Sequence, residues 1–186
     1  MELKYFLIFT ITYVLRNLLE IFIQPRSVTL TTRRDINDAI SLTILVAGHF
    51  LAGISICYYL LTDNSIDPIF YSTGLVIFLT GFAGRIISLK VLGKNYSKNI
   101  QCPVDSFLVK TGPYSVIRHP MYLFYIIEMT GFLIIRFNAI SLASLILVVL
   151  AVIYRIESEE KILQARFSAE FEQYSKSTKK IIPFIC

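Results

Sequence analysis

Residues 121–154 read MYLFYIIEMTGFLII, then RFN, then AISLASLILVVLAVIY, two apolar runs separated by only three residues. Each run would form a helix of about 23 Å, somewhat shorter than the ~30 Å hydrocarbon core of a bilayer. Such a pair indicates a helical hairpin that either dips most of the way through a membrane or is lengthened by its flanks. Either way, the chain returns to the side from which it came.

Three longer apolar segments precede this hairpin, at about residues 3–23, 39–61 and 68–89. Each has about the ~20 residues that cross a bilayer as a helix. On the third segment Thr80, Gly84 and Ser88 recur every fourth residue, a spacing that lets membrane helices pack closely. We therefore predict one all-α membrane domain over residues 1–186, a bundle of about five transmembrane helices whose last two form the hairpin.

The composition agrees with a membrane protein. Apolar residues make up 55% of the chain and charged residues only 17%, against about 25% charged residues in a typical soluble domain. With 14 Phe and 11 Tyr the chain is too aromatic to be disordered. The net charge of +5 lies on a mostly apolar chain, which does not favour a nucleic-acid partner. The three cysteines and two histidines are too widely spaced for a disulfide framework or a metal site.

Lysine and arginine gather in three segments, residues 26–34, 90–118 and 155–180. Because basic loops stay on the cytoplasmic side, all three should face the cytoplasm and the N-terminus should lie outside. We expect a multi-pass protein of a prokaryotic plasma membrane rather than of the endoplasmic reticulum. From Arg155 onward the pattern becomes that of a separate amphipathic helix, lying against the bundle or the membrane surface and ending near Tyr174.

Ionisable residues inside the apolar segments need partners. Arg16 and Glu20 are one helical turn apart and should pair. An ionised Glu128 within a membrane helix costs free energy unless it has a partner or a function. We therefore expect either a structural pair with Arg85 or Arg136, or a role in a tunnel that admits an acceptor molecule. His49 is expected to be a hydrogen-bonded core residue.

The densest polar cluster spans residues 111–122, TGPYSVIRHPMY. A proline at the first turn of a helix costs no hydrogen bond, so His119 and Pro120 indicate a helix start. The unpaired N–H groups there favour a carboxylate ligand. Farther along, Arg155 and Glu159 share one helical face, which from spacing alone indicates a simple salt bridge or part of a site.

Over roughly residues 85–175 the sequence resembles the isoprenylcysteine carboxyl methyltransferases and the related phospholipid methyltransferases, integral membrane enzymes that use S-adenosylmethionine. The resemblance rests on LGKNYS at 92–97, LVKTGPY at 108–114, RHPMY at 118–122, and Glu159–Glu160 followed by Leu163, Phe167 and Tyr174. In combination these elements are specific. Family members commonly have His where Ser106 stands, and Gly where Ser168 follows Phe167.

The resemblance implies a cytosol-facing pocket for S-adenosylmethionine, formed by residues 90–120 and 155–180. It implies that Arg155 meets the acceptor, as the one catalytic residue. The implied cofactor contacts, carried over by position, are Gln101, Ser106, Phe107, Leu108, Val109, Tyr114, His119, Pro120, Met121, Tyr122 and Glu159. The residue types suit this ligand, since Glu159 would meet its ammonium and aromatic side chains its adenine and sulfonium.

The expected function is methyl transfer to a lipophilic acceptor, most like C-terminal carboxylate O-methylation of an isoprenylcysteine. The expected partners are therefore the bilayer and a membrane lipid or prenylated acceptor, with no nucleic acid and no metal. A phospholipid N-methyltransferase is an alternative. A carboxylate acceptor needs no general base, whereas an amine must first lose a proton. A more remote alternative is an NADPH-dependent membrane reductase similar to the sterol reductases, although these are longer.

Overall fold

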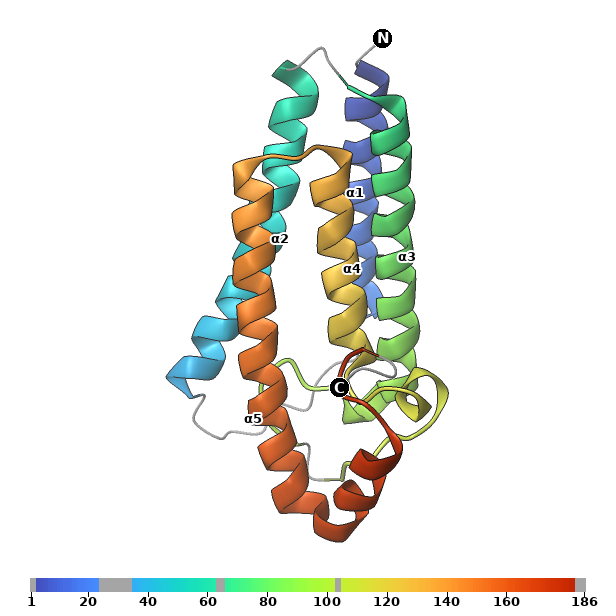
Figure 1. Ribbon diagram of the computed structural model, residues 1–186, viewed down its shortest axis with the longest axis vertical. Coiled ribbons are helices and arrows are strands. Elements are labelled where there is room, and N and C mark those ends of the chain that lie inside the picture. The colour runs from blue at the N-terminus through green and yellow to red at the C-terminus, as the bar shows by residue number, and fades with distance from the viewer. Residues whose placement is uncertain (1–2, 24–34, 63–65, 103–104, 183–186) are drawn as a thin grey trace.

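A computed structural model describes residues 3–23, 35–62, 66–102 and 105–182. The helices in these ranges are α1 (Leu3–Ile23), α2 (Ile36–Thr62), α3 (Pro68–Leu92), α4 (Pro120–Ile135) and α5 (Ala139–Ser177), with short 3-10 helices η1 (Gly93–Asn95) and η2 (Gly112–Ser115) in the α3–α4 connector (Figure 1). The predicted all-α, multi-pass helical architecture is confirmed. Four helices are long and apolar enough to cross a membrane, and α4 is shorter. The predicted basic segment 26–34 lies outside the described residues.

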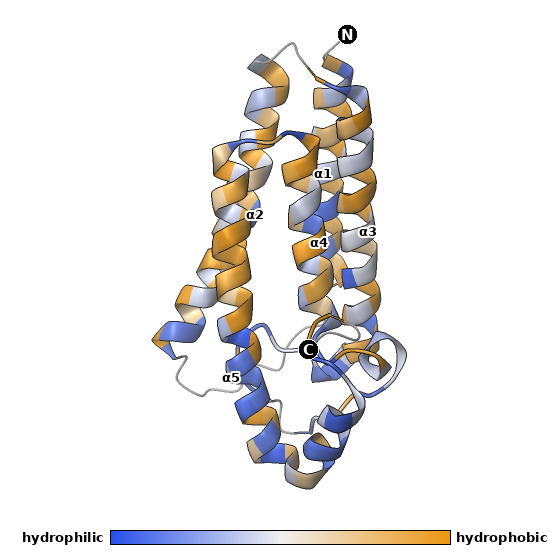
Figure 2. Ribbon diagram, in the orientation of Figure 1, coloured by the Kyte–Doolittle hydropathy of each residue, from blue (hydrophilic) through white to orange (hydrophobic). Residues whose placement is uncertain are grey.

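The predicted hairpin is formed by α4 and α5. The side chain of Asn138 caps α5 by accepting a hydrogen bond from the Ser141 N–H at 2.9 Å, a common way to begin a helix. The connector and the last part of α5 lie together at the end of the bundle opposite the N-terminus (Figure 1). Hydrophilic residues gather at this end (Figure 2). The bundle therefore has an apolar body and one polar end.

Glycines let α3 and α4 approach each other closely. A Cβ atom on Gly81 would lie 2.4 Å from the backbone nitrogen of Glu128, and one on Gly131 would lie 2.5 Å from that of Phe78. Gly84 and Ser88 are buried, as their predicted packing role requires, but Thr80 is exposed. The packing face therefore runs through Gly81 rather than Thr80.

The segment from Arg155 onward is helical, as predicted, but it does not begin a new helix at Arg155. The helix of the fifth apolar run continues through Arg155 as part of α5, and its regular part from Ala139 to the break at Ser168 is about 44 Å long. This is longer than the ~30 Å hydrocarbon core, so the part beyond Tyr154 projects from the apolar region. The direction reverses at Ser168, whose φ of 39° and ψ of −110° interrupt the helix.

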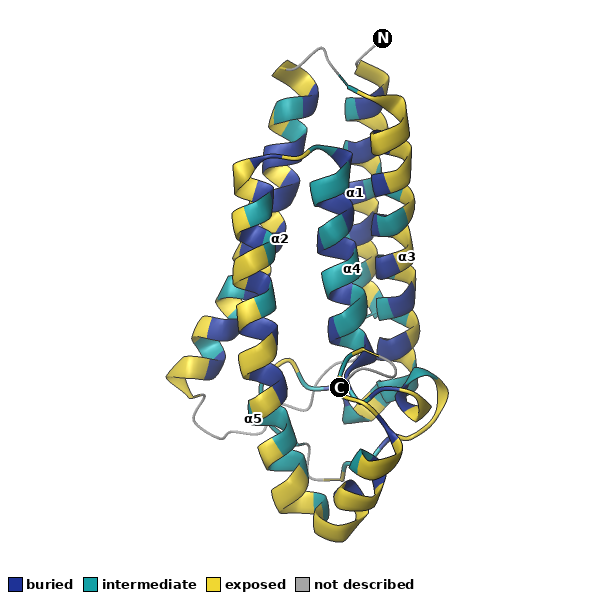
Figure 3. Ribbon diagram, in the orientation of Figure 1, coloured by how far each residue is buried: buried dark blue, intermediate teal, exposed yellow. Residues whose placement is uncertain are grey.

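An ionic network joins α1, α3 and α4 inside the bundle. Arg16 pairs with Glu20, as predicted, and also binds both carboxylate oxygens of Glu128. Arg85 donates to both oxygens of Glu20, at 2.6 and 3.1 Å, and lies 3.9 Å from Glu128. The expectation for Glu128 is thus met in part, because its main partner is Arg16. The side chains of Arg16 and Glu128 are buried and those of Glu20 and Arg85 nearly so, and the network ties the three helices in one register. Figure 3 shows that exposed residues lie along the outer edge of α3, while α4 is mostly buried or intermediate.

His49 is a core residue, as predicted, but its predicted side-chain hydrogen bond is absent among the described residues. Its side chain is 4% exposed and stacks against the rings of Tyr13 and Tyr125. Neither ring nitrogen has a hydrogen-bond partner among the described residues. Aromatic contact therefore holds the imidazole in place.

Candidate functional site

The connector after α3 is shaped by a glycine and an asparagine. Gly93 has a φ of 52°, a left-handed conformation that glycine adopts without steric cost. The Asn95 amide then donates to the Leu92 carbonyl at 3.1 Å and accepts from the Phe107 N–H at 2.9 Å. These bonds fix the segment around Phe107 beside the end of α3.

The start of α4 is joined to the chain that follows α5. Backbone N–H groups of Arg118 and His119 donate to the carbonyls of Lys179 and Lys180 at 2.8 and 3.0 Å. The Arg118 guanidinium reaches the Glu160 carboxylate at 2.8 Å and the Thr178 carbonyl at 2.5 Å. The reversal at Ser168 makes this closure possible, because it turns the end of α5 back toward α4.

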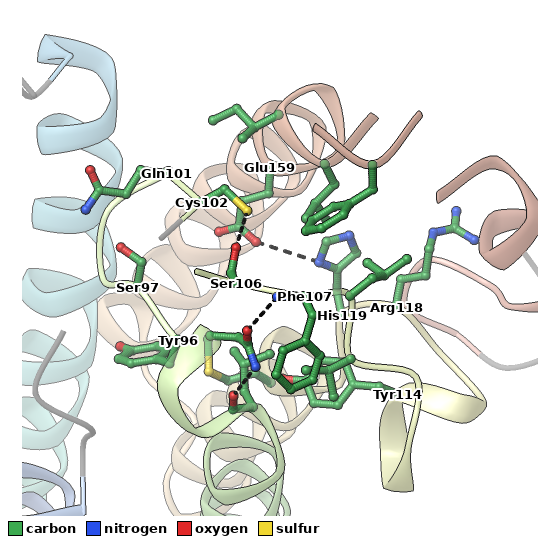
Figure 4. Close-up of a pocket in the computed structure, with 18 of the residues that line it drawn as sticks. Tyr96, Ser97, Gln101, Cys102, Ser106, Phe107, Tyr114, Arg118, His119 and Glu159 are labelled. Carbon is green, nitrogen blue, oxygen red and sulfur yellow. Dashed lines mark hydrogen bonds and ion pairs between the residues drawn. The ribbon is translucent and has the colours of Figure 1, made fainter. Parts of the chain in front are cut away.

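These segments enclose a cavity, called here the connector cavity (Figure 4). Ten of the eleven predicted cofactor residues line it, and Pro120 is instead buried in the first turn of α4. In Figure 4, Arg118 lies on the opposite side of the cavity from Gln101. Further lining residues are Leu92, Asn95, Tyr96, Ser97, Asn99, Cys102, Arg118, Ile162, Leu163, Phe167 and Tyr174. Of these, all but Asn99, Cys102 and Ile162 belong to the sequence motifs already noted, and those three carried no separate signal.

Glu159 and His119 line the connector cavity, and His119 also contacts Glu160. Glu159 accepts a hydrogen bond from the Tyr122 hydroxyl and lies 3.8 Å from Nδ1 of His119. Burial by itself would raise the pKa of Glu160, but hydrogen bonds from His119 and Arg118 outweigh it and lower that pKa to about 2. Burial also raises the pKa of Tyr114, so this hydroxyl stays protonated. Within the described ranges no three His, Cys, Asp or Glu side chains are grouped to hold a metal ion.

A second cavity, the bundle cavity, lies among the helices and has a volume of about 440 Å³. Its wall contains charged groups from three helices, Arg16, Glu20, Arg85 and Arg155, together with apolar residues of α2. It also reaches Ile21, Val46 and Phe50, which are exposed on the outer surfaces of α1 and α2. Four residues line both cavities and so form the partition between them: Tyr96, Ser97, Met121 and Tyr122.

Arg155 lines the bundle cavity and not the connector cavity. Its expected helical partner Glu159 is 3.9 Å away, whereas Asp38 at the start of α2 is 2.9 Å away. Sequence reasoning missed Asp38. The spacing of Asp38, Ser41 and Leu45 was an available signal, because it places the three residues on one face of a helix. In the structure all three are buried.

The sequence is similar to those of known proteins over part of its length. Residues 74–165 match the model of the isoprenylcysteine carboxyl methyltransferase (ICMT) family. A protein-S-isoprenylcysteine O-methyltransferase of Saccharomyces cerevisiae is 35% identical over 115 residues, which cover 60% of this chain and 48% of that protein. The nickel-cobalt-cadmium resistance protein NccN of Alcaligenes xylosoxydans xylosoxydans is 36% identical over 78 residues, covering 41% of this chain and 36% of that protein. The chain thus spans about half the length of the yeast relative and about a third of the other.

Proposed function

Because this chain belongs to the isoprenylcysteine carboxyl methyltransferase family, we propose that it transfers a methyl group from S-adenosylmethionine to the carboxylate of a prenylcysteine-like lipid acceptor. The observation that carries this proposal is the pair of cavities that share one wall. A cavity at the polar end of the bundle suits a water-soluble cofactor, and a cavity among the apolar helices suits a lipid. The two reactants would meet at the partition.

The side chains around the connector cavity fit S-adenosylmethionine. Glu159 offers a carboxylate to an ammonium group, and its side chain remains 27% exposed. Tyr114, Phe107 and Phe167 offer aromatic faces to adenine and to a sulfonium cation. The start of α4 offers the N–H of Met121, which has no acceptor within its own helix. When bound, this cofactor supplies an electrophilic methyl group, which an oxygen nucleophile takes as S-adenosylhomocysteine leaves.

The charge around the bundle cavity favours an anionic acceptor over an amine. Three guanidinium groups, those of Arg16, Arg85 and Arg155, line this cavity. Its one carboxylate, on Glu20, already binds Arg16 and Arg85. A carboxylate is already nucleophilic at neutral pH, whereas an amine acceptor would need a base, for which this wall offers the imidazole of His49. This arrangement supports O-methylation over the N-methylation of a phospholipid.

The chain's own residues would act by positioning and by excluding water. Tyr122 donates to Glu159 and accepts from Nε of Arg155 at 3.0 Å, so one hydroxyl links the group proposed for the cofactor to the group proposed for the acceptor. Met121 and Tyr96 complete the partition. Holding the two reactants in line can supply much of the rate enhancement without a general base.

The apolar helices and the family make this an integral membrane protein. The end that carries the connector cavity would face the cytoplasm, where S-adenosylmethionine is made, and the N-terminus would lie outside. The basic residues at 90–118 and 155–180 support this orientation. The acceptor would enter laterally from the membrane between α1 and α2, where the bundle cavity reaches exposed apolar residues. A prokaryotic plasma membrane is the proposed location.

Calorimetric titration of the detergent-purified protein with S-adenosylhomocysteine tests the cofactor, with NADPH as the comparison. We expect binding of S-adenosylhomocysteine alone. His119→Ala and Glu159→Ala should weaken this binding, while Lys176→Ala, which removes an exposed cation farther along α5, should not. Binding of NADPH alone would overturn the proposal in favour of a reductase.

Transfer of a labelled methyl group to N-acetyl-S-farnesylcysteine tests the reaction. Arg155→Ala should retain cofactor binding and lose most of the turnover. If Arg155→Ala abolished cofactor binding in a folded protein, the role proposed for this residue would be wrong. Turnover with a phosphatidylethanolamine and none with the farnesylcysteine would favour the amine acceptor instead.

A further inference from the structure

The guanidinium of Arg155 has a protein partner at every nitrogen. Nε donates to the Tyr122 hydroxyl at 3.0 Å, and Nη2 donates to the Lys98 carbonyl at 2.7 Å. Nη1 donates to Asp38 at 2.9 Å and to the Ser41 hydroxyl at 3.2 Å. Four of the five N–H donors are thus used, so an acceptor carboxylate that binds Arg155 through two parallel hydrogen bonds must displace one of these groups.

Asp38 is the partner whose chemistry matches the acceptor. The Tyr122 and Ser41 hydroxyls and the Lys98 carbonyl are neutral, whereas Asp38 is a carboxylate. If the acceptor displaced a neutral group, its carboxylate would join those of Asp38 and Glu159 at one buried guanidinium, and like charges at a buried site repel strongly. If it displaces Asp38, one ion pair is exchanged for another of the same charge and geometry.

The surroundings leave room for this exchange. Arg155 lines the bundle cavity, but Asp38 lines a third cavity, between the start of α2 and α5. The ion pair thus joins the walls of two different cavities. A carboxylate that leaves Arg155 can turn into the third cavity, whose wall also contains the cation Arg166. The burial of both paired side chains, 3% and 7% exposed, means that their separation needs a compensating charge.

We infer that Asp38 occupies the acceptor-carboxylate position on Arg155 and competes with the acceptor for it. This inference rests on the proposed function. It has a second consequence, since the other carboxylate oxygen of Asp38 accepts the Ile100 N–H at 3.1 Å. The neighbours of Ile100, Asn99 and Gln101, line the connector cavity. Displacement of Asp38 by an acceptor would therefore also release the connector beside the cofactor.

Asp38→Asn tests the competition, because the asparagine side chain has the same shape without the charge. The probe is N-acetyl-S-farnesylcysteine, compared with its carboxamide. We expect the Kd of the carboxylate, and its KM in methyl transfer, to fall by roughly tenfold, with a smaller change for the carboxamide. If Asp38 only held Arg155 in place, the variant would bind the carboxylate more weakly or equally well, and either result would overturn the inference.

Asp35→Asn is the matched control. Asp35 precedes α2 and its carboxylate accepts the Asn37 N–H at 3.3 Å, a capping role that asparagine also performs. This variant should bind both probes as the wild type does. Titration with S-adenosylhomocysteine separates the two levels of failure. If the wild type binds no S-adenosylhomocysteine, the proposed function is contradicted. The Kd values of the carboxylate probe for the wild type and Asp38→Asn test the exchange at Arg155 by themselves, because they do not depend on turnover.

Hydrogen exchange on the wild type gives a test that needs no variant. The carboxylate probe should accelerate amide exchange in the first turn of α2 and around Ile100, because Asp38 would no longer tie them to α5. The carboxamide should not. Equal or slower exchange with the carboxylate would contradict displacement of Asp38. So would a failure of both the wild type and Asp38→Asn to bind the carboxylate probe.

Discussion

The hydroxyl of Tyr122 donates a hydrogen bond to the carboxylate of Glu159 across the partition of the two cavities. The same oxygen accepts from Nε of Arg155. Two charged side chains on one face of α5 thus share a single hydroxyl of α4 as a hydrogen-bond partner.

Tyr122→Phe should therefore lower kcat/KM for methyl transfer by about tenfold or more, since hydrogen bonds to charged groups contribute ~1.5–3 kcal/mol each. Labelled methyl transfer measures the change. Tyr71→Phe is a suitable control, because it removes a buried hydroxyl that donates to the Tyr5 carbonyl, away from both cavities. An unchanged kcat/KM in Tyr122→Phe would contradict the proposed positioning role.

Gly81→Ala should destabilise the fold by about 1–3 kcal/mol, the usual cost of overpacking. The added methyl group would lie 2.4 Å from the backbone nitrogen of Glu128, and backbone cannot move aside as a side chain can. Thermal unfolding in detergent measures the effect, with the neighbouring exposed Thr80→Ala as the control. Equal stability of the two variants would show that α3 and α4 are not in such close contact.

Ser168→Gly should stabilise the protein by about 0.5–1 kcal/mol, because Ser168 has a φ of 39° and only glycine adopts such a conformation without strain. The resemblance already indicated glycine as the common family residue here. Ala165→Gly, in a regular part of the same helix, should instead destabilise by about 1 kcal/mol. A lower melting temperature for Ser168→Gly than for the wild type would argue against the reversal of chain direction at Ser168.

Acid should weaken the closure between α4 and the end of α5. The pKa of Glu160 is lowered to about 2 in the folded protein, so its ionised form favours the fold. That contribution is complete above the pKa of the unfolded chain and is lost as the pH falls from about 4.5 toward 2. The melting temperature of Glu160→Gln should accordingly fall less between pH 7 and pH 3 than that of the wild type. Glu170→Gln, at an exposed ion pair with Lys110, should match the wild type.

The sequence predicted the α4–α5 hairpin because hydropathy alone marks two helices and the break between them. It did not predict that α5 continues beyond Arg155. The hydropathy changes there, but the following residues are mostly good helix formers, so the backbone has no reason to stop. The motif residues around His119 lie on one cavity because they are close in the chain and in the connector.

Pairs that are distant in the chain could not be predicted in the same way. Arg155 and Asp38 are separated by 117 positions, and Arg16 and Glu128 by 112. Their contacts depend on the rotation of each helix about its axis, which a charge in an apolar segment does not specify. Sequence patterns could say that Glu128 needs a cation, but three arginines were available within the membrane segments or at their ends, and packing chose between them.

The residues that line the two cavities are distributed unequally along the chain. Apart from Phe167 and Tyr174, every residue that lines the connector cavity lies within the family-matched segment, residues 74–165, whereas more than half of the bundle cavity's wall comes from α1 and α2, outside it. On the proposed function, mutation in the first two helices would change which acceptor binds, while the residues proposed for the cofactor would stay the same.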